Sequence, residues 1–343
     1  MESEYIKVLW REFRSLKISS YYLTFEKLRR VLTLDLVLRC VEDAYRYTAV
    51  AKSELQMPSK EYFFYEDGDM RIMPAIAKID GEVVTGMKIV SVHFDNPKSN
   101  LPTVIGFFIL VDSKTGSLLS VFDATYLTAM RTGASGAVSA KYFLKNKEKI
   151  KVGIIGCGVQ ARTQIIFLAH LKKIEELVIY DISEKALESF SSFVRKLGLT
   201  PRIAKTLYDF SNCDIVVTLT PSREPFVMPE HVENVKLINA MGADAPGKQE
   251  LHPQILKNST IIVDNLNQSV HAGEINVPLK KGEITKEMIF GEIGEVIAGL
   301  KTPPDNKRIV FDSTGIAILD LFVGFGVYKE ARKMGLLKSF KIH

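Results

Sequence analysis

The chain of 343 residues has few cysteines, and their arrangement excludes two kinds of site. Cys40, Cys157 and Cys213 are an odd number, lie far apart and show no Cys-x-x-Cys spacing, so neither a disulfide framework nor a zinc site is expected. The six histidines also lack a metal-ligand spacing, and no protein-bound metal is predicted. Isolated cysteines suit a reducing compartment, and we expect a cytoplasmic protein.

The sequence also lacks long apolar stretches and a strong excess of one charge. Its longest uncharged run, Ser99–Val111, is shorter than the ~18 apolar residues that cross a membrane. Charged residues are frequent at the start of the chain, which argues against a signal peptide. The net charge of +5 comes from 45 basic and 40 acidic residues spread along the chain, so no nucleic-acid-binding tract is expected. Small anionic molecules remain compatible partners.

What is present is typical of a globular protein. Hydrophobic residues make up 46% and charged residues 25% of the chain, which excludes a disordered or low-complexity protein. The length suits one large domain or two of ordinary size. Because the residue pattern changes near 145–149, we predict a first unit over residues 1–147 and a second over 148–299, with 300–343 completing the first.

The first unit is predicted to combine helices with an antiparallel sheet. Apolar residues recur at helical spacing over 34–52, and small residues suggest a second, closely packed helix over 127–143. Between these helices, residues 61–123 contain short β-like runs separated by turn residues, which indicates hairpins. The apolar segment 313–334 is predicted to be helical and to pack back on this unit.

In the second unit, short apolar strands alternate with helices, which predicts βαβ units on a parallel sheet. The fold class is therefore α/β, a Rossmann-type doubly wound parallel sheet joined to an α+β dimerisation and substrate domain. The expected strands are Val152–Ile155, Leu177–Tyr180, Asp214–Leu219, Val235–Ala240 and Thr260–Val263, and the expected helices are Val159–Leu171, Glu184–Leu197 and Gln249–Lys257.

A glycine motif predicts a dinucleotide site in this second unit. Gly156–Ala161 reads Gly-x-Gly-x-x-Ala and lies directly between a predicted strand and a predicted helix. The first glycine allows the tight turn, Gly158 lets the backbone approach a pyrophosphate, and the helix N-terminus favours its charge. Asp181 ends the next strand, 23 residues beyond Gly158, where an acid binds the ribose hydroxyls. A carboxylate there repels a 2′-phosphate, which favours NAD over NADP.

Several cations of the first unit are candidates for chemistry. Lys60, Arg71 and Lys88 lie at ends of β-like runs and Arg131 at an expected helix start, although a solvated charge is the simpler interpretation of each alone. Lys88 differs because it interrupts an apolar run, where a charge is costly unless it is used. Asp244 follows a predicted parallel strand, the position at which α/β domains contact ligands.

The motifs resemble those of the ornithine cyclodeaminase/mu-crystallin family, in order, over about residues 20–340. Its archaeal-type alanine dehydrogenases are the branch with the greatest resemblance. The family motifs are Asn100–Thr103, Asp123–Tyr126, Arg131–Ala134, Gly156–Ala161, Gly294–Ile297 and Asp312–Gly315, and those of the branch are Met57–Lys60, Gly242–Leu251 and Gly273–Val277.

This resemblance implies a homodimer with a shared β-rich dimerisation and substrate region, over which a Rossmann domain holds the nicotinamide. It also implies that Lys88 is the catalytic lysine, that Asp244 is the catalytic aspartate, and that Arg131 contacts the substrate carboxylate or the cofactor. The expected cofactor contacts are Arg131, Thr132, Gly156, Gly158, Val159, Gln160, Asp181, Thr220, Met241, Gly242, Ala243, Asp244 and Ser313.

Two positions depart from the cyclodeaminase pattern. Lys60 stands where cyclodeaminases carry an arginine, and Arg71 where they carry a glutamate near the second amine of ornithine. Like charges ~4 Å apart repel by ~4 kcal/mol at an effective dielectric constant of ~20, so Arg71 disfavours ornithine. A small neutral amino acid fits better, with Arg71 gripping its carboxylate in a bidentate manner.

We therefore predict NAD-dependent, reversible oxidative deamination of a small amino acid such as L-alanine. Lys60, Arg71 and Arg131 are the candidate substrate-binding residues, and Lys88 and Asp244 would exchange protons while water attacks the imino acid. Neighbouring cations and burial would lower the pKa of Lys88 enough for this task. The alternatives are a cyclodeaminase, an imine reductase, and a binding protein that holds the nucleotide without turnover.

Overall fold

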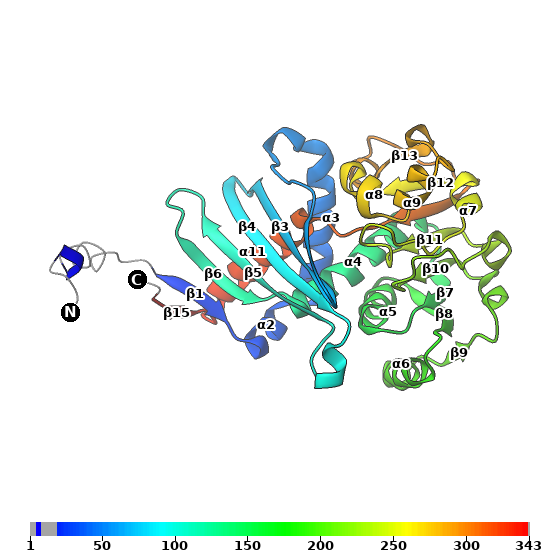
Figure 1. Cartoon of the computed structure of the whole chain (residues 1–343), viewed down its shortest axis with the longest axis horizontal. Helices are drawn as coiled ribbons and strands as arrows, with labels where there is room; N and C mark the ends of the chain where they lie inside the picture. The colour runs from blue at the N-terminus through cyan, green and yellow to red at the C-terminus, as the bar shows by residue number, and fades with distance from the viewer. Residues whose placement is uncertain (1–4, 8–18, 342–343) are drawn as a thin grey trace.

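The computed structural model describes residues 5–7 and 19–341. The charged N-terminal stretch that argued against a signal peptide lies largely outside these residues. Two sheets, side by side in Figure 1, organise the described chain. Among these residues, no helix is both long enough and apolar enough to cross a membrane.

The first sheet has seven strands in the order β15-β1-β6-β5-β4-β3-β2. The strands from β2 to β6 pair in an antiparallel manner, which confirms the hairpins predicted over 61–123. β3 and β4 are longer than the expected runs because their alternation of buried and half-buried side chains continues without a break. The strands are β1 (Ser20–Leu23), β2 (Glu61–Tyr65), β3 (Gly68–Ile79), β4 (Glu82–His93), β5 (Val104–Asp112), β6 (Leu118–Asp123) and β15 (Lys338–Phe340).

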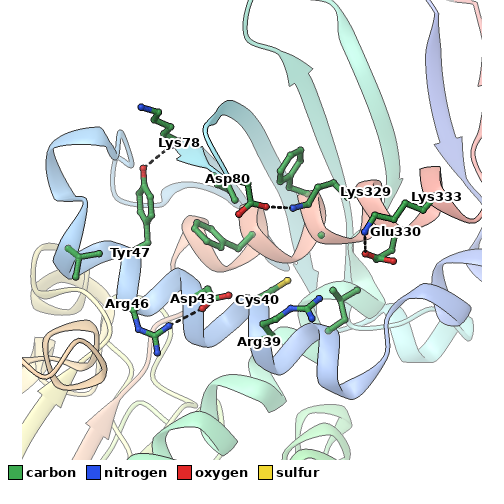
Figure 2. A pocket seen from close by; sticks show the side chains of 16 residues that line it. Arg39, Cys40, Asp43, Arg46, Tyr47, Lys78, Asp80, Lys329, Glu330 and Lys333 are labelled. Atoms are coloured by element: carbon green, nitrogen blue, oxygen red, sulfur yellow. Dashed lines mark hydrogen bonds and ion pairs between the residues drawn. The ribbon is translucent and has the colours of Figure 1, made fainter.

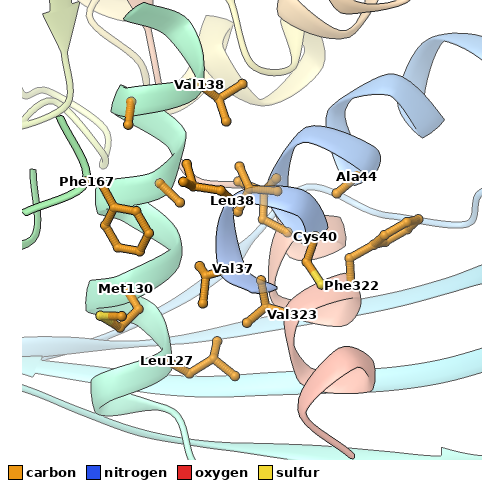
Figure 3. Packing of buried hydrophobic residues seen from close by; sticks show 14 of the residues in the cluster. Val37, Leu38, Cys40, Ala44, Leu127, Met130, Val138, Phe167, Phe322 and Val323 are labelled. Atoms are coloured by element: carbon orange, nitrogen blue, oxygen red, sulfur yellow. The ribbon is translucent and has the colours of Figure 1, made fainter. Parts of the chain in front are cut away.

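Helices pack beside this sheet and form much of its core. They are α2 (Phe25–Val31), α3 (Leu34–Val50), α4 (Thr125–Phe143) and α11 (Ala317–Lys333), which confirms the three helices expected in this unit. Figure 3 shows Val37 of α3, Leu127 of α4 and Val323 of α11 meeting in one apolar cluster. Gly324 allows α11 to approach the sheet, since a Cβ there would lie 2.2 Å from the Phe108 ring.

The second sheet is wholly parallel, with the order β13-β12-β14-β11-β10-β7-β8-β9, and it confirms the Rossmann-type prediction. The chain order reverses at β7, so the carboxyl ends of β7 and β10 border the crevice where such sheets bind ligands. The strands are β7 (Lys149–Ile155), β8 (Lys173–Tyr180), β9 (Pro201–Ile203), β10 (Ile215–Thr218), β11 (Leu237–Ala240), β12 (Ser259–Val263), β13 (Ile289–Glu292) and β14 (Arg308–Asp312).

Two of the differences from expectation concern the start of a predicted helix and the end of this unit. The helix expected over 249–257 begins only at Pro253, because Leu251 pairs with Val227 and the buried Glu250 lies in extended chain. β14 had no predicted counterpart and lies between β11 and β12, so the return to the first unit begins after Asp312 instead of at residue 300. The helices are α5 (Val159–Leu171), α6 (Glu184–Lys196), α7 (Pro253–Lys257), α8 (Leu266–Ala272), α9 (Asn276–Lys280) and α10 (Ile293–Ile297).

Candidate active site

The cations singled out in the sequence lie around one small cavity between the two sheets. The cavity has a volume of about 90 Å³, and Lys60, Arg71, Lys88, Arg131 and Asp244 all line it. The expected positions within elements were partly wrong. Arg71 and Lys88 lie inside β3 and β4 because both strands are longer than predicted, and Arg131 lies in the second turn of α4.

Lys88 is held by a carboxylate that the sequence analysis did not single out. Its Nζ lies 2.8 Å from each carboxylate oxygen of Asp320, and both side chains are fully buried. Asp320 also accepts a 3.1 Å hydrogen bond from Nε of Arg131. Burial and Arg131 lower the pKa of Lys88 to about 7, although Asp320 acts in the opposite direction. This lysine can therefore exchange a proton near neutral pH.

Lys60 joins the two units across the cavity. Its Nζ donates to the main-chain oxygens of Thr314 at 2.7 Å and Asp244 at 3.1 Å. Burial and the adjacent Arg71 lower the pKa of Lys60 to about 7. The site thus holds two lysines whose charge an arriving anion would stabilise.

Arg71 lies between two carboxylates. Its Nε and Nη2 donate to Asp69 at 2.6 and 3.2 Å, and its Nη1 donates to Oδ2 of Asp244 at 2.6 Å. Burial would lower the pKa of Arg71, but Asp244 and Asp69 raise it, so this group stays charged. The other oxygen of Asp244 accepts from Lys248 at 2.6 Å.

These contacts change two expectations about Arg71. The edge formed by Nε and Nη2 is already used by Asp69, so a bidentate grip on a substrate requires Nη1 and Nη2. The predicted repulsion of ornithine considered Arg71 alone. Because Asp69 and Asp244 both contact its guanidinium, Arg71 repels the second amine of ornithine by less than the ~4 kcal/mol expected for two isolated like charges.

The glycine motif forms one wall of a larger cleft, of about 650 Å³, on the second unit. Gly156 has a φ of 97° and lies against the carbonyl of Leu219, a conformation that favours glycine, while Gly158 faces open space at the start of α5. Asp181 accepts hydrogen bonds from the backbone N–H groups of Cys157 at 2.7 Å and Ser183 at 2.8 Å. An open glycine, a helix N-terminus and an acid at the second strand fit a dinucleotide.

The expected cofactor residues divide between the two hollows. Gly156, Gly158, Asp181 and Thr220 line the larger cleft. Gln160, two residues past Gly158, lines the small cavity, so the glycine loop leads from one hollow to the other. Arg131, Thr132, Gln160, Met241, Asp244 and Ser313 line the small cavity, whereas the structure places Val159, Gly242 and Ala243 in the walls of neither.

A buried carboxylate fixes the loops that carry Thr220 and Asp244. Glu250 accepts hydrogen bonds from the backbone N–H groups of Thr220 at 2.7 Å and Gly242 at 3.1 Å, and from the Thr218 hydroxyl at 2.6 Å. Burial raises the pKa of Glu250, and these donors lower it. Sequence reasoning missed Glu250, Lys248, Asp69 and Asp320. For Asp320 a signal exists, because it interrupts an apolar run as Lys88 does.

Another hollow, of about 570 Å³, lies over α3, α11 and the β3–β4 turn (Figure 2). Most of the basic side chains that line it form ion pairs with acidic residues of the same hollow, as Arg46 does with Asp43 and Lys329 with Asp80. It shares no lining residue with the cavity or the cleft. The candidate active site is therefore the cavity beside the glycine loop. In the described part of the chain, no three His, Cys, Asp or Glu side chains gather as a metal site.

Known proteins resemble this chain over most of its length. An alanine dehydrogenase from Archaeoglobus fulgidus is 43% identical over 325 residues, covering 93% of this chain and 98% of that protein. A solved archaeal alanine dehydrogenase dimer with bound NAD has a TM-score of 0.87 at 42% identity, covering 95% of this chain and 100% of that one.

A reductase has a similar structure at lower identity. Delta(1)-pyrroline-2-carboxylate reductase from Thermococcus litoralis, in complex with NADH and L-proline, has a TM-score of 0.85 at 29% identity, covering 93% of this chain and 99% of that one. The sequence model of the ornithine cyclodeaminase/mu-crystallin family matches residues 21–335. This chain therefore belongs to the ornithine cyclodeaminase/mu-crystallin family.

Proposed function

We propose that this protein is an NAD-dependent dehydrogenase that converts L-alanine, or a similarly small L-amino acid, into its 2-oxo acid and ammonia, reversibly. One observation carries the proposal: a small cavity, lined by two buried lysines of lowered pKa, two arginines and an aspartate, lies beside a glycine loop that fits a dinucleotide. The similarity to an alanine dehydrogenase and to a dimer with bound NAD supports the choice of substrate and cofactor.

The dimensions of the cavity support a small side chain. Its volume of about 90 Å³ leaves little room beyond a compact amino acid, and its apolar wall consists of Met73, Val90, Val92 and Val104. Arg71 and Lys88 lie beside this wall on the same strands, and the other charged groups that line the cavity are Lys60, Arg131 and Asp244. A substrate can therefore place its carboxylate among the cations and a methyl group against the apolar wall.

The reaction balances as L-alanine, NAD⁺ and water giving pyruvate, ammonium, NADH and a proton. NAD, when bound, accepts the hydride from the Cα of the substrate. Lys60 and Arg71 hold the carboxylate, and Arg131 contributes charge beside Lys88. Lys88 in its neutral form takes a proton from the substrate ammonium group or from the attacking water, and Asp244 exchanges the other proton.

We further propose that the protein is a homodimer that buries the outer face of its first sheet. Ile72 of β3, Ile89 of β4 and Phe107 of β5 are cross-strand neighbours on that face. Phe107 is 46% exposed, and apolar patches of this kind mark interfaces. The similar alanine dehydrogenase structure is a dimer. Cys40, Cys157 and Cys213 are buried and unpaired, which supports a reducing, cytoplasmic location.

The dimer is tested by sedimentation of the Phe107→Lys variant. A charge on the buried face should convert the dimer to monomers, whereas Tyr208→Lys changes an exposed aromatic of the second unit and should leave the dimer intact. A Phe107→Lys variant that sediments as wild type does would contradict the proposed interface.

The activity is tested by following NADH absorbance with purified protein and NAD, with L-alanine and L-ornithine as separate substrates and ammonia assayed in parallel. Stoichiometric NADH and ammonia from alanine supports the dehydrogenase. Ammonia from ornithine without NADH would identify a cyclodeaminase instead. A reaction seen only from an imine and NADH would identify an imine reductase.

A further inference from the structure

Asp244 occupies Nη1 of Arg71, the nitrogen that Asp69 leaves free. Asp69 takes the edge formed by Nε and Nη2, and the Arg71 and Asp69 side chains are both nearly buried, at 7% and 12% exposure. Arg71 and Asp244 both line the cavity, and Nη1 of Arg71 donates to Oδ2 of Asp244 at 2.6 Å. A ligand carboxylate that approaches Nη1 of Arg71 therefore finds this position already occupied by Asp244.

Of the two partners, Asp244 is the one that is free to leave. Its side chain is 32% exposed, and its other oxygen is held by Lys248 at 2.6 Å, so it retains a cationic partner after departure from Arg71. The backbone of its loop is fixed independently, since the carbonyl of Asp244 accepts from the Tyr62 hydroxyl at 2.9 Å and from Lys60. Rotation of one side chain is enough to open the position.

We propose that the carboxylate of a small 2-oxo or 2-amino acid displaces Asp244 from Arg71, so that substrate binding itself releases the aspartate that exchanges protons. The inference rests on the proposed function, in which Arg71 binds the substrate and Asp244 acts on it.

The charges around Asp244 explain why its release matters. Arg71 of β3, Lys60 of the chain before β2 and Lys248 of its own loop act on Asp244, while Asp264 at the end of β12 acts on Lys60. Burial opposes its ionisation, but Arg71 and Lys248 hold the pKa of Asp244 well below its usual value, which makes it a poor proton acceptor. Once a ligand carboxylate neutralises Arg71, the pKa of Asp244 rises, and its capacity to accept a proton rises too.

The direct test is a crystal structure of the protein with NADH and propionate, a carboxylate that has no amine and cannot react. We expect a propionate oxygen on Nη1 of Arg71, with Asp244 beyond hydrogen-bond distance of Arg71 and still on Lys248. Propionate on Arg71 with Asp244 still on Nη1 would overturn the proposal. So would propionate bound away from Arg71.

A binding measurement tests the same competition in solution. In the Asp244→Asn variant the competitor has lost its charge, so the Kd of propionate in the presence of NADH should fall roughly tenfold to a hundredfold. Asp69→Asn removes a charge at equal proximity to Arg71 but frees no position, so it should tighten binding much less than Asp244→Asn does.

Equal tightening in both variants, or none in Asp244→Asn, would refute displacement. Because propionate is never oxidised, this result is independent of turnover. A wild-type protein that forms no NADH from alanine would instead refute the proposed function.

Discussion

The ion pair between Lys88 and Asp320 predicts how activity depends on pH. If Lys88 accepts a proton in its neutral form, kcat/KM for alanine should fall about tenfold per pH unit below its pKa of about 7. An opposite charge in contact raises the pKa of a lysine by about 1 to 3 units. The Asp320→Asn variant lacks this charge 2.8 Å from Nζ, so the acid limb of its profile should move from near 7 to about pH 4–6.

The assay is the profile of kcat/KM against pH, with two further variants. Glu330→Gln alters a carboxylate on the same helix that pairs with Lys333 at the surface, and it should leave the limb in place. Arg131→Met removes the cation that lowers the pKa of Lys88, so in whatever activity remains the limb should move to higher pH. An acid limb that stays near 7 in an active Asp320→Asn variant would refute the assignment of Lys88.

Three further substitutions test the site. Lys88→Met should reduce turnover about 10²- to 10⁴-fold while NADH binding, followed by fluorescence, persists; full turnover would exclude Lys88 from proton transfer. Asp181→Ala should weaken NAD binding about tenfold and reduce the discrimination against NADP, as measured by the KM values of both cofactors. An equal rise in the KM values for NAD and NADP would contradict this role. Met73→Ala shortens a side chain of the apolar wall and so enlarges the cavity, which should raise kcat/KM for 2-aminobutyrate relative to alanine. An unchanged ratio of the two kcat/KM values would show that Met73 does not select the substrate side chain.

Elements with a strong local pattern were predictable from the sequence. The run Gly156–Ala161, between a buried strand and a helix, permits few backbone conformations, and the structure forms the predicted strand, turn and helix there. α3 followed from apolar residues at helical spacing. β14 did not, because only three apolar residues stand between Arg308 and Asp312, too few to identify a strand, and its place between β11 and β12 depends on contacts distant in sequence.

The site was predictable in its residue types but not in its partners. A lysine within an apolar run indicates a functional role, because an unused charge there is costly, and Lys88 lines the cavity of the candidate site. Which carboxylate balances it depends on how α11 returns to the first sheet, so Asp320 at 232 residues' separation could not be assigned from spacing. In the same way, Asp244 meets Arg71 only because the two units face each other, whereas Asp69 lies two residues from Arg71 on the same strand.

The most direct test of the account follows the hydrogen that leaves the substrate. With L-alanine carrying deuterium at Cα, unlabelled NAD and purified protein, mass spectrometry of the dinucleotide reports whether the hydride moves. The account predicts one deuterium in each NADH formed, together with one pyruvate and one ammonia. Deuterium absent from the NADH, or ammonia released without net NADH, would contradict it.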